Sequence, residues 1–586
     1  MRGTPVLIIG AGPVGLTLAL DLAWRDVDVT VVETRGPGEL PSVKCNHVAA
    51  RSMEIFRRLG IADAIRDAGL PAEYPHDVAY RTTTTGIELA RIPIPCRRDR
   101  DVVTGGPDSD WPTPEPAHRI NQIYLEPILF AAARAHDRIT ILNRVVMEDL
   151  VQTDVGVTVH VRDLDTGRES TLETRFLVGC DGGSSRTRKL IGASLQGDAV
   201  VQKVQSTFIS AGSLLDRIQH NPAWGTFSLN PRRCGMVYAI DGKERWLIHN
   251  YLDPGESFGS VNRDQSIRQI LGVGDDFSYE TVSIQDWIGR RLVADRFRSG
   301  RVFLCGDAAH IWVPFGGYGM NAGIADAVNL SWLLTATIAG WADPAILDAY
   351  EGERLPITEQ VSRFAMSHAR AVAEQRLAIP ATIEDVGPAA DRTRAAWGKA
   401  AYDLNLAQYC AAGLNFGYFY DNSPIIAYDG GQAPEYSMGS YTPSTVPGCR
   451  VPHVWLQDGR SLYDACGKGY TLLVVDPTAE ADGVVTAAAN LGVPLTVLQV
   501  DSAAAAFVYD HKLVLSRPDG HIAWRGDHEP PDCRELMRRL SGVHATVSLI
   551  PEGPSAPREP TGGRPGLSAT PVPSAFTMKT LASEVP

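Results

Sequence analysis

The sequence contains few cysteines, and their placement excludes two common architectures. Nine cysteines are scattered over 586 residues, an odd number with no CxxC pair and no Cys and His spacing typical of a metal site. Neither a disulfide framework nor a zinc site is therefore predicted, and no metal is expected. A reducing cytoplasm is the expected location.

The sequence also lacks an excess of positive charge. Its 55 Lys plus Arg and 68 Asp plus Glu give a net charge of −13. This balance speaks against nucleic acid or an anionic membrane as a partner. No window is apolar for long enough to span a bilayer, and the first apolar stretch is interrupted by a turn of Gly and Pro, which is atypical of a signal peptide. We expect a cytoplasmic protein of two or three domains.

A glycine-rich turn near the N-terminus has the context of a dinucleotide site. Residues 6–9 form an apolar run of strand length, residues 10–15 read GAGPVG, and helix formers occupy residues 16–24. A second β-branched run ends at Glu33. A strand, a GxGxxG turn, a helix and a second strand ending in an acid together predict a βαβ dinucleotide-binding unit.

Each glycine of the turn has a separate expected role. Gly10 makes the turn, Gly12 lets the backbone approach a pyrophosphate, and Gly15 lets helix and strand pack. The phosphates would lie at the helix N-terminus, and Glu33 would accept from the ribose hydroxyls. The alternative is a tight structural turn, and the motif alone does not distinguish FAD from NAD.

Two later segments repeat the pattern of a strand followed by a glycine turn. The first, RFLVGCDGGSSRTRKLIG, contains Asp181 and Gly182. The second, RVFLCGDAAHIWVPFGGYGMN, has four glycines and a proline between an expected strand and an expected helix. Three such units, separated by long insertions, indicate one extended cofactor that is touched at several points.

With these three motifs the chain resembles the single-component FAD-dependent aromatic hydroxylases of the p-hydroxybenzoate hydroxylase fold. It is most similar to the phenol-type branch, which includes 2,4-dichlorophenol 6-monooxygenase and 2-hydroxybiphenyl 3-monooxygenase. The resemblance covers about residues 4–550. It implies hydroxylation of a phenolic or hydroxy-heteroaromatic ring by O2 through a flavin C4a-hydroperoxide. FAD would be the cofactor, NADPH or NADH the transient reductant, and a homo-oligomer the assembly.

The resemblance also implies a set of cofactor contacts. Asp307 would lie on the ribityl chain, and Pro314 would stiffen the turn whose glycines face the flavin ring. The N–H groups at the following helix start would stabilise negative charge on the reduced flavin. The predicted cofactor-binding residues are Gly10, Gly12, Pro13, Val14, Gly15, Glu33, Thr34, Arg35, Arg51, Gln122, Asp181, Gly182, Gly306, Asp307, Pro314, Gly317, Gly319, Met320 and Asn321.

Alternating runs between residues 193 and 298, such as GTFSLN, CGMVYAI and RWLIHNYL, predict a β-sheet. In the family this sheet covers the substrate. Most of its aromatic side chains are equally compatible with a plain hydrophobic core. The predicted substrate-binding residues are Asn46, Trp224, Phe227, Tyr238, Trp246, Pro314 and Phe315.

The proton acceptor is where the sequence departs from the phenol branch. That branch has an acid or a histidine five residues before the helix arginine that corresponds to Arg51, and this chain has Asn46 there. An amide cannot take a proton, so we expect Asn46 to orient the substrate by hydrogen bonding. His47, His249 and Tyr251 are the alternative routes for the proton, unless the substrate is acidic enough to bind already ionised.

The predicted fold class is α/β, with a Rossmann-like FAD domain, an inserted β-sheet substrate domain and a C-terminal thioredoxin-like domain. The expected divisions are 1–192 for the first part of the FAD domain, with 76–115 contributing to the substrate domain; 193–298 for the substrate-binding sheet; 299–428 for the rest of the FAD domain and a helical connection; 429–550 for the thioredoxin-like domain without CxxC; and 551–586 for a flexible tail.

Three functional alternatives remain open at this point. The aromatic hydroxylase could be a tailoring enzyme of natural-product biosynthesis or a degradative phenol or chlorophenol hydroxylase. A flavoprotein oxidase, reductase or halogenase of the same fold is the second class, although the WxWxIP motif of the halogenases is absent. A non-catalytic FAD-binding or thioredoxin-like scaffold is the third.

Overall fold

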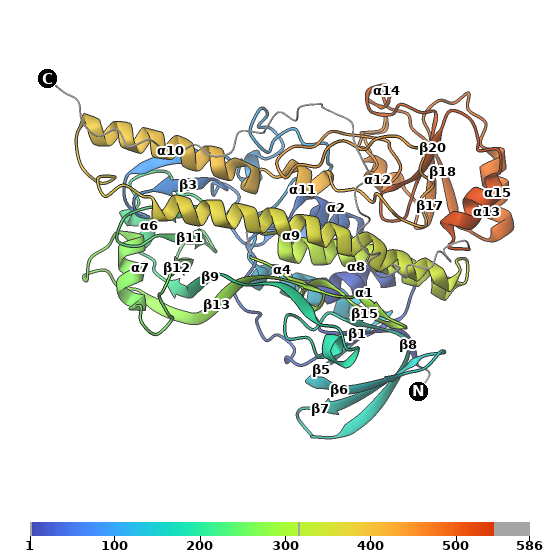
Figure 1. Ribbon diagram of the computed structural model, residues 1–586, viewed down its shortest axis with the longest axis horizontal. Helices are drawn as coiled ribbons and strands as arrows, with labels where there is room; N and C mark the ends of the chain where they lie inside the picture. The colour runs from blue at the N-terminus through green and yellow to red at the C-terminus, as the bar shows by residue number, and fades with distance from the viewer. Residues whose placement is uncertain (1–2, 314–316, 544–586) are drawn as a thin grey trace, which may run out of the picture. The chain divides into compact units, whose positions relative to one another are not determined.

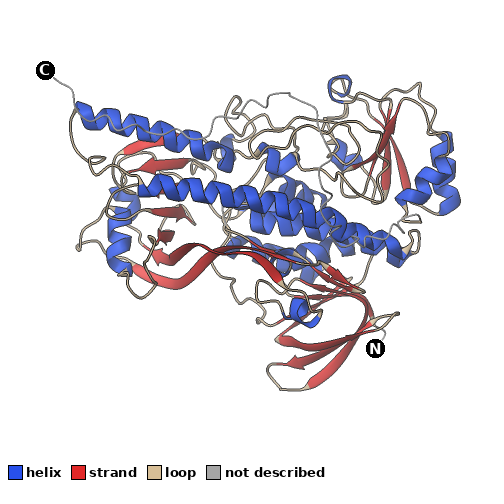
Figure 2. Ribbon diagram, viewed as in Figure 1, coloured by secondary structure: helices blue, strands red, loops and turns tan. Residues whose placement is uncertain are grey.

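The computed structural model of the chain describes residues 3–313 and 317–543. The predictions for Pro314, Phe315 and the tail 551–586 therefore lie outside the described residues. Within them the chain forms two eight-stranded sheets and one four-stranded sheet, which are drawn as red arrows among blue helices in Figure 2. The predicted α/β class is confirmed.

The first sheet brings the ends of three strands together. Its order is β14 (Arg298–Ser299), β15 (Val302–Leu304), β8 (Glu169–Gly179), β1 (Thr4–Ile9), β2 (Val29–Glu33) and β5 (Ile139–Asn143), with the β6 (Val145–Gln152) and β7 (Val157–Asp163) pair attached to β8. The strands β15, β8, β1, β2 and β5 are parallel to one another. Both Ile9 and Leu304 pair with Gly179. The three glycine turns consequently leave the sheet at the same edge, where parallel sheets bind ligands.

The second sheet has two different faces. Its order is β16 (His310–Ile311), β13 (Glu280–Ala294), β9 (Leu195–Ser210), β12 (Arg245–Tyr251), β11 (Gly235–Ala239), β10 (Gly225–Ser228), β3 (Val78–Arg81) and β4 (Glu88–Ile92). On one face Phe208 and Leu247 pack with Ile123, close to the first sheet's helices. Helix α7 (Arg263–Leu271) covers the other face, where Ile270 lies against Gly235.

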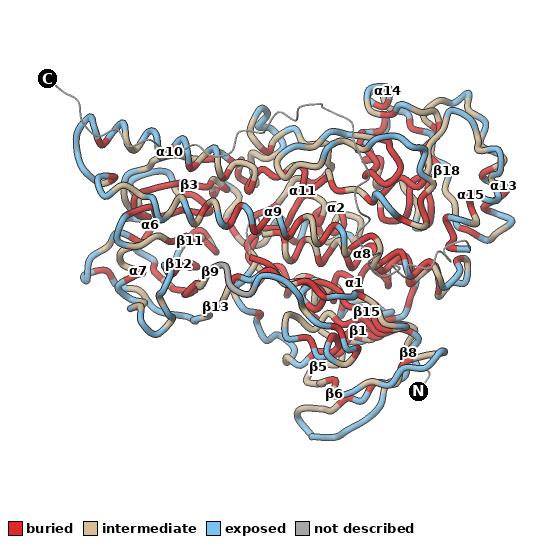
Figure 3. The backbone as a smooth tube through the Cα atoms, viewed as in Figure 1, coloured by how far each residue is buried: buried red, intermediate tan, exposed pale blue. Residues whose placement is uncertain are grey.

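The helices join these sheets. They are α1 (Pro13–Trp24), α2 (Ala50–Arg58), α3 (Ala62–Asp67), α4 (Gln122–Ala135), α5 (Arg186–Leu190), α6 (Leu214–Arg217), α8 (Tyr318–Ala339), α9 (Asp348–Leu377), α10 (Pro388–Tyr409) and α11 (Ala412–Phe416). Helices α1 and α8 pack together, in the region where Figure 3 shows the buried backbone of β1 and α1. The prediction that no window is apolar for long enough to span a bilayer was wrong for α8, the one described helix that is long and apolar enough, of whose most apolar window 72% is buried inside the protein.

The third sheet belongs to the C-terminal part, which is coloured orange to red in Figure 1. Its order is β18 (Leu495–Gln499), β17 (Tyr470–Val474), β19 (Leu513–Ser516) and β20 (Ile522–Gly526), and its helices are α12 (Leu462–Ala465), α13 (Asp482–Leu491), α14 (Ala505–Val508) and α15 (Cys533–Leu540). This mixed sheet with flanking helices is thioredoxin-like. Burial raises the pKa of its Cys466 to about 11, whereas a redox-active thiol needs a lowered pKa.

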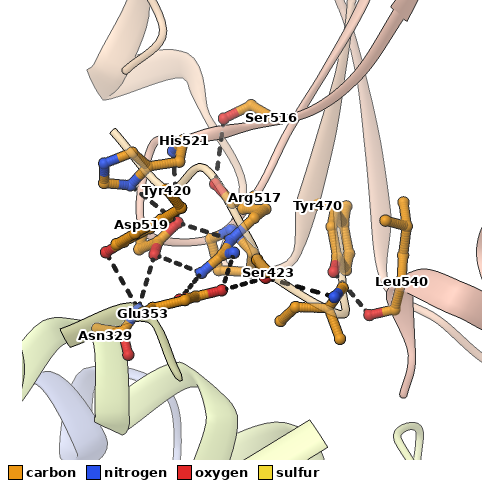
Figure 4. Close-up of polar contacts among 12 residues, drawn as sticks. Asn329, Glu353, Tyr420, Ser423, Tyr470, Ser516, Arg517, Asp519, His521 and Leu540 are labelled. Carbon is orange, nitrogen blue, oxygen red and sulfur yellow. Dashed lines mark hydrogen bonds and ion pairs between the residues drawn. The ribbon is translucent and has the colours of Figure 1, made fainter. Parts of the chain in front are cut away.

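A buried ion network joins this third sheet to helices α8 and α9 (Figure 4). The Arg517 guanidinium donates to both carboxylate oxygens of Glu353, at 2.6 and 2.8 Å, and to Asp519 at 2.8 Å. Asn329 on α8 donates to Glu353 at 2.7 Å and to Asp519 at 3.3 Å. The C-terminal part is thus attached to the same helix that begins at the third glycine turn.

Candidate active site

The first glycine turn contains two glycines that the protein itself requires and one that it does not. Gly10 has a φ of +105°, and a Cβ on Gly15 would lie 2.0 Å from the Gly10 carbonyl oxygen. Gly12, the N-cap of α1, has an ordinary φ of −75°, and a Cβ there would meet no atom within 4 Å in the part of the chain that the structure describes. Glycine is a favoured N-cap residue, and the open backbone here also leaves room for the predicted pyrophosphate at the start of the helix.

The third turn repeats this observation. Gly319 lies in the first turn of α8, and a Cβ there would again meet no atom of the described residues within 4 Å. Asp307 is exposed between the buried Gly306 and Ala308. An open backbone surface and a free carboxylate are what the ring and ribityl chain of FAD need, so the residues fit this cofactor.

Glu33 ends β2 beside the first turn with its carboxylate already oriented. It accepts hydrogen bonds from the backbone N–H groups of Ala11 at 2.7 Å and Arg35 at 2.9 Å. Burial alone would raise the pKa of Glu33, but these bonds and the Arg35 guanidinium hold it below its ordinary value. The ionised carboxylate suits the ribose hydroxyls. Arg35 also pairs with Glu126 at 2.5 Å, and Glu126 accepts from the Gln122 side chain at 2.9 Å.

The remaining turn residues hold the turns to one another. The Val14 side chain packs against two glycines of the third segment. A Cβ built on Gly306 would lie 3.1 Å from Val14 Cγ2, and one built on Gly323 would lie 2.6 Å from it. Pro13 occupies the first position of α1, and the Thr34 hydroxyl donates to Glu33 at 3.3 Å. The first and third turns are therefore in contact.

Asp181 caps helix α5 in this structure. Its carboxylate accepts from the backbone N–H groups of Arg186 at 2.8 Å and Thr187 at 2.9 Å, and Gly182 has a φ of +76°. Arg188 on α5 donates to the carbonyls of Gly183 and Ala308, both at 2.8 Å. The second turn is thereby attached to the third, and Arg188 is a positioning residue that the sequence reasoning missed.

Asn321 has a role that its predicted backbone contact did not suggest. Its side-chain oxygen accepts from the Ala49 N–H at 2.9 Å and the Ser52 hydroxyl at 2.7 Å. Its amide group donates to the carbonyls of Gly317 at 2.7 Å and His47 at 3.2 Å. Asn321 therefore fixes the start of α8 to the start of α2. Met320 beside it is buried.

The two candidates before α2 are both engaged. The Asn46 side-chain oxygen accepts from the Asn121 amide. His47 Nδ1 lies 2.5 Å from the Arg119 guanidinium, and because arginine only donates, Nδ1 must be the acceptor. Burial and the Arg119 charge lower the pKa of His47 well below its ordinary value. His47 is consequently a neutral imidazole, and its Nδ1 is not available as a base.

One face of the second sheet collects the aromatic candidates. Strand pairing places Phe227 opposite Met236 and Tyr80, and Met236 opposite His249, so these side chains share a face. The Phe227 and Tyr80 rings stack with centroids 5.2 Å apart. Tyr238 lies on the same face, two residues from Met236.

Trp224 and Tyr409 extend this aromatic face. The Trp224 ring lies 4.9 Å from Tyr238 and 6.2 Å from Tyr409, which ends α10. Trp246 departs from the prediction. Its strand position puts it on the face covered by α7, and its indole N–H donates to the Ala211 carbonyl at 3.3 Å. This placement argues against a substrate contact for Trp246, because neighbouring strand residues point to opposite faces.

His249 ends a directional hydrogen-bond chain. The Trp287 indole N–H donates to the Ser206 hydroxyl at 2.7 Å, and that hydroxyl lies 2.6 Å from His249 Nδ1. The Ser206 hydroxyl accepts from the indole and has its own proton to donate to Nδ1, and in that tautomer the His249 proton is on Nε2. Burial lowers the pKa of His249 to about 4. His249 is therefore a neutral imidazole at neutral pH.

Tyr251 and Arg51 are the last two candidates. Burial raises the pKa of Tyr251, and Arg376 lies 4.3 Å over its ring. Arg51 donates to the Asp519 carbonyl at 3.0 Å and lies 5.4 Å from the Tyr418 ring centroid. It lines a cavity of about 100 Å³ between α2 and the C-terminal part. These contacts give no support to the predicted pyrophosphate contact of Arg51.

The comparisons with known proteins agree with this geometry. The model of the FAD binding domain family matches residues 3–365. The chain belongs to the FAD-dependent aromatic-ring hydroxylases. The model of the aromatic-ring hydroxylase C-terminal family matches residues 444–543 of this hydroxylase, which includes the whole third sheet. The predicted resemblance, the enzyme class and FAD are confirmed.

Similar proteins cover nearly the whole of this hydroxylase. Tetracenomycin B2 monooxygenase-dioxygenase of Streptomyces olivaceus is 31% identical over 578 residues, which are 93% of this chain and 98% of the relative. The FAD-dependent monooxygenase apdD of Emericella nidulans is 30% identical over 553 residues, 89% and 87% of the two chains. The solved structure of the rebeccamycin biosynthetic enzyme RebC with reduced flavin is 34% identical, with a TM-score of 0.83 over 92% of this chain and 99% of RebC.

Proposed function

We propose that this hydroxylase inserts one oxygen atom of O2 into a phenolic or hydroxy-heteroaromatic ring, with NADPH or NADH as the reductant. The observation that supports this most is the meeting of two surfaces. His47 is adjacent to Gly317, whose Cβ would lie 3.0 Å from that of His47. Through Arg119, His47 also connects to Trp224 of the aromatic face.

The chain's own residues prepare the site in three ways. The N-terminus of α1 and Gly12 bind the pyrophosphate, Glu33 the ribose and Asp307 the ribityl chain. The first turn of α8 stabilises negative charge at the edge of the ring. The aromatic face around Phe227 and Tyr238 excludes water, and bound FAD supplies the electrons for O2 activation.

Asn46 and His249 orient the substrate ring without taking its proton. The Asn46 oxygen already accepts from Asn121, so its amide group is left to donate to a substrate oxygen. In the tautomer whose Nδ1 accepts from Ser206, the His249 Nε2–H is the second donor. Two neutral donors of this kind suit a substrate oxygen that arrives ionised or loses its proton directly to solvent.

We favour a tailoring role in natural-product biosynthesis over a degradative one. The two relatives named for tetracenomycin are 31% and 29% identical to the chain, and aklavinone 12-hydroxylase RdmE is 31% identical. The RebC structures are 33–34% identical. The second candidate is degradation of simple phenols, which phenol 2-monooxygenase and 2,4-dichlorophenol 6-monooxygenase support at 29% and 28% identity. We also propose that the protein is cytoplasmic and that it binds neither nucleic acid nor membrane. We propose that it forms a homo-oligomer, and light scattering measures its oligomeric state.

The test is oxygen incorporation. The FAD-loaded protein is incubated with NADPH or NADH and ¹⁸O2 over a panel of simple phenols and polycyclic hydroxyaromatics, and the products are analysed by mass spectrometry. We expect one labelled oxygen in a ring product and faster NAD(P)H consumption with that substrate. Hydrogen peroxide as the sole product across the panel would favour an oxidase or reductase instead. A larger turnover with polycyclic than with simple phenols supports the tailoring role.

A further inference from the structure

Arg119 is a buried guanidinium that has no carboxylate partner among the described residues. Its side chain is enclosed, with the residue 3% exposed. It contacts His47 Nδ1 at 2.5 Å, the Tyr409 carbonyl at 3.3 Å and the Trp224 ring at 4.4 Å from the centroid. No ion pair to Arg119 occurs in residues 3–313 and 317–543. An arginine is charged at any pH a protein tolerates, and burying an unpaired charge is costly.

The charges around Arg119 leave one positive charge uncompensated. The acid that acts on it is Asp108, but Arg100 already binds the Asp108 carboxylate at 2.8 Å and its carbonyl at 2.9 Å. Burial lowers the pKa of His118 to about 3 and raises that of Cys410 to about 12, so both are neutral. The same holds for three other facing groups, His47, His76 and Tyr409.

The position of Arg119 is the second observation. Its partner His47 lies against Gly317 of the cofactor turn, while its other neighbours, Trp224 and Tyr409, belong to the aromatic face. The excess charge therefore lies between the two surfaces that would enclose a substrate ring. We propose that Arg119 binds the anionic oxygen of the substrate, so that the enzyme selects a singly charged aromatic anion.

This inference rests on the proposed function and explains how the reaction proceeds without a base at Asn46. A cation a few ångströms from a phenol favours its ionised form by about 1 to 3 pKa units. The proton is released to solvent on binding, and no side chain has to accept it. The ionised ring is also the more electron-rich one, which is what attack on activated oxygen requires.

The experiment measures ligand binding to the FAD-loaded protein by perturbation of the flavin absorbance. The probes are 4-nitrophenol as a phenolate, benzoate as a carboxylate and 4-nitroanisole as the uncharged analogue. The variants are Arg119→Gln, Arg119→Lys and, as a matched control, Arg290→Gln. Arg290 is an exposed arginine on β13.

We expect Arg119→Gln to weaken one or both anions by about 10- to 100-fold, the range of a charge-assisted hydrogen bond, and to change 4-nitroanisole binding by less than about 3-fold. Arg119→Lys should recover part of the loss, and Arg290→Gln should behave as the wild type. The absorbance of bound 4-nitrophenol should show a lower pKa than the free compound, and should lose that shift in Arg119→Gln. Loss of only the phenolate or only the carboxylate identifies which anionic oxygen is bound.

Two outcomes overturn the inference. One is equal weakening of all three probes in Arg119→Gln, which would make Arg119 structural. The other needs no variant: wild-type protein that binds 4-nitroanisole as well as the anions, or binds none of them. Labelled product from an uncharged ring would leave the proposed function standing without the anion. Arg119-dependent anion binding without labelled product would support the anion site and contradict the proposed function.

Discussion

Gly12 is the residue where one added side chain tests the cofactor cradle directly. Its backbone conformation is ordinary and its surroundings in the protein are open, so Gly12→Val should fold normally but place a side chain where the pyrophosphate approaches. We expect the variant to lose FAD on dilution and gel filtration, as measured by the ratio of flavin to protein absorbance. Asp307→Ala should also bind FAD more weakly, by about 1.5 to 3 kcal/mol for a lost charge-assisted hydrogen bond.

The matched control for this pair is Gly259→Val. Gly259 is exposed and equally free of neighbours within 4 Å, so its variant should keep full flavin content. Wild-type FAD occupancy in both Gly12→Val and Asp307→Ala would contradict the cradle.

The protonation of His249 should be visible in the pH dependence of stability. Its pKa is about 4 in the folded protein because of burial, compared with about 6.5 in an unfolded chain. Between these values the unfolded chain binds a proton that the folded protein does not, so stability falls as the pH drops from about 6.5 to about 4. Urea unfolding at pH 7 and pH 5 should show a smaller loss for His249→Gln than for the wild type. His220→Gln, at an exposed histidine, should keep the wild-type difference.

At the scale of the element, the N-termini of α2 and α8 act as one unit. The Asn321 side chain holds them through four hydrogen bonds, to Ala49, Ser52, Gly317 and His47. We expect Asn321→Leu to lower the free energy of unfolding by about 1 to 3 kcal/mol, since it leaves buried polar groups without partners. FAD affinity should fall as well, because Gly317 belongs to the cofactor turn. Asn490→Leu on α13, at an exposed asparagine, is the control, and equal effects of the two changes would argue against this coupling.

The sequence predicts the elements that have a local signal. The β-branched run that ends at Glu33 is strand β2 in the structure. Helix α1 begins at Pro13, inside the predicted glycine turn of residues 10–15. The roles of Asn321, Arg188 and Arg119 were not predictable in this way, because each has a partner between 72 and 290 residues away, namely Ala49, Ala308 and the pair His47 and Tyr409. An arginine in HRINQ has no local feature that reveals a missing carboxylate. Trp246 shows the converse case, since alternation alone does not say which face of a sheet meets the substrate.

At the scale of the whole molecule, the C-terminal part is attached to the cofactor-binding part by the Glu353, Arg517 and Asp519 network (Figure 4). All three side chains are buried. Burial alone would raise the pKa of Asp519, but Arg517 holds it well below its ordinary value. Because Glu353 lies on α9 and Asn329 on α8, the network fixes the C-terminal sheet to the helix that starts at the cofactor turn. Burial raises the pKa of the Cys466 thiol in this part, whereas a redox-active thiol needs a lowered one.

Removing two partners of this network together should cost less than the sum of the two single removals. Glu353→Met leaves Arg517 paired with Asp519 alone and removes the acceptor of the Asn329 and Ser423 side chains, which should cost about 1 to 3 kcal/mol. Arg517→Met leaves two carboxylates facing each other and should cost at least as much. In the double variant Glu353→Met/Arg517→Met only Asp519 remains charged, with Asn329 and His521 beside it. Its loss of unfolding free energy should therefore be smaller than the sum of the two single losses, by about 1 to 3 kcal/mol.

Urea unfolding followed by both flavin absorbance and tryptophan fluorescence measures this coupling. The two signals should change together in the wild type and separate in the single variants, as the C-terminal part detaches before FAD is released. Additive losses would show that the charges act independently and that the two parts are joined by their apolar contacts alone.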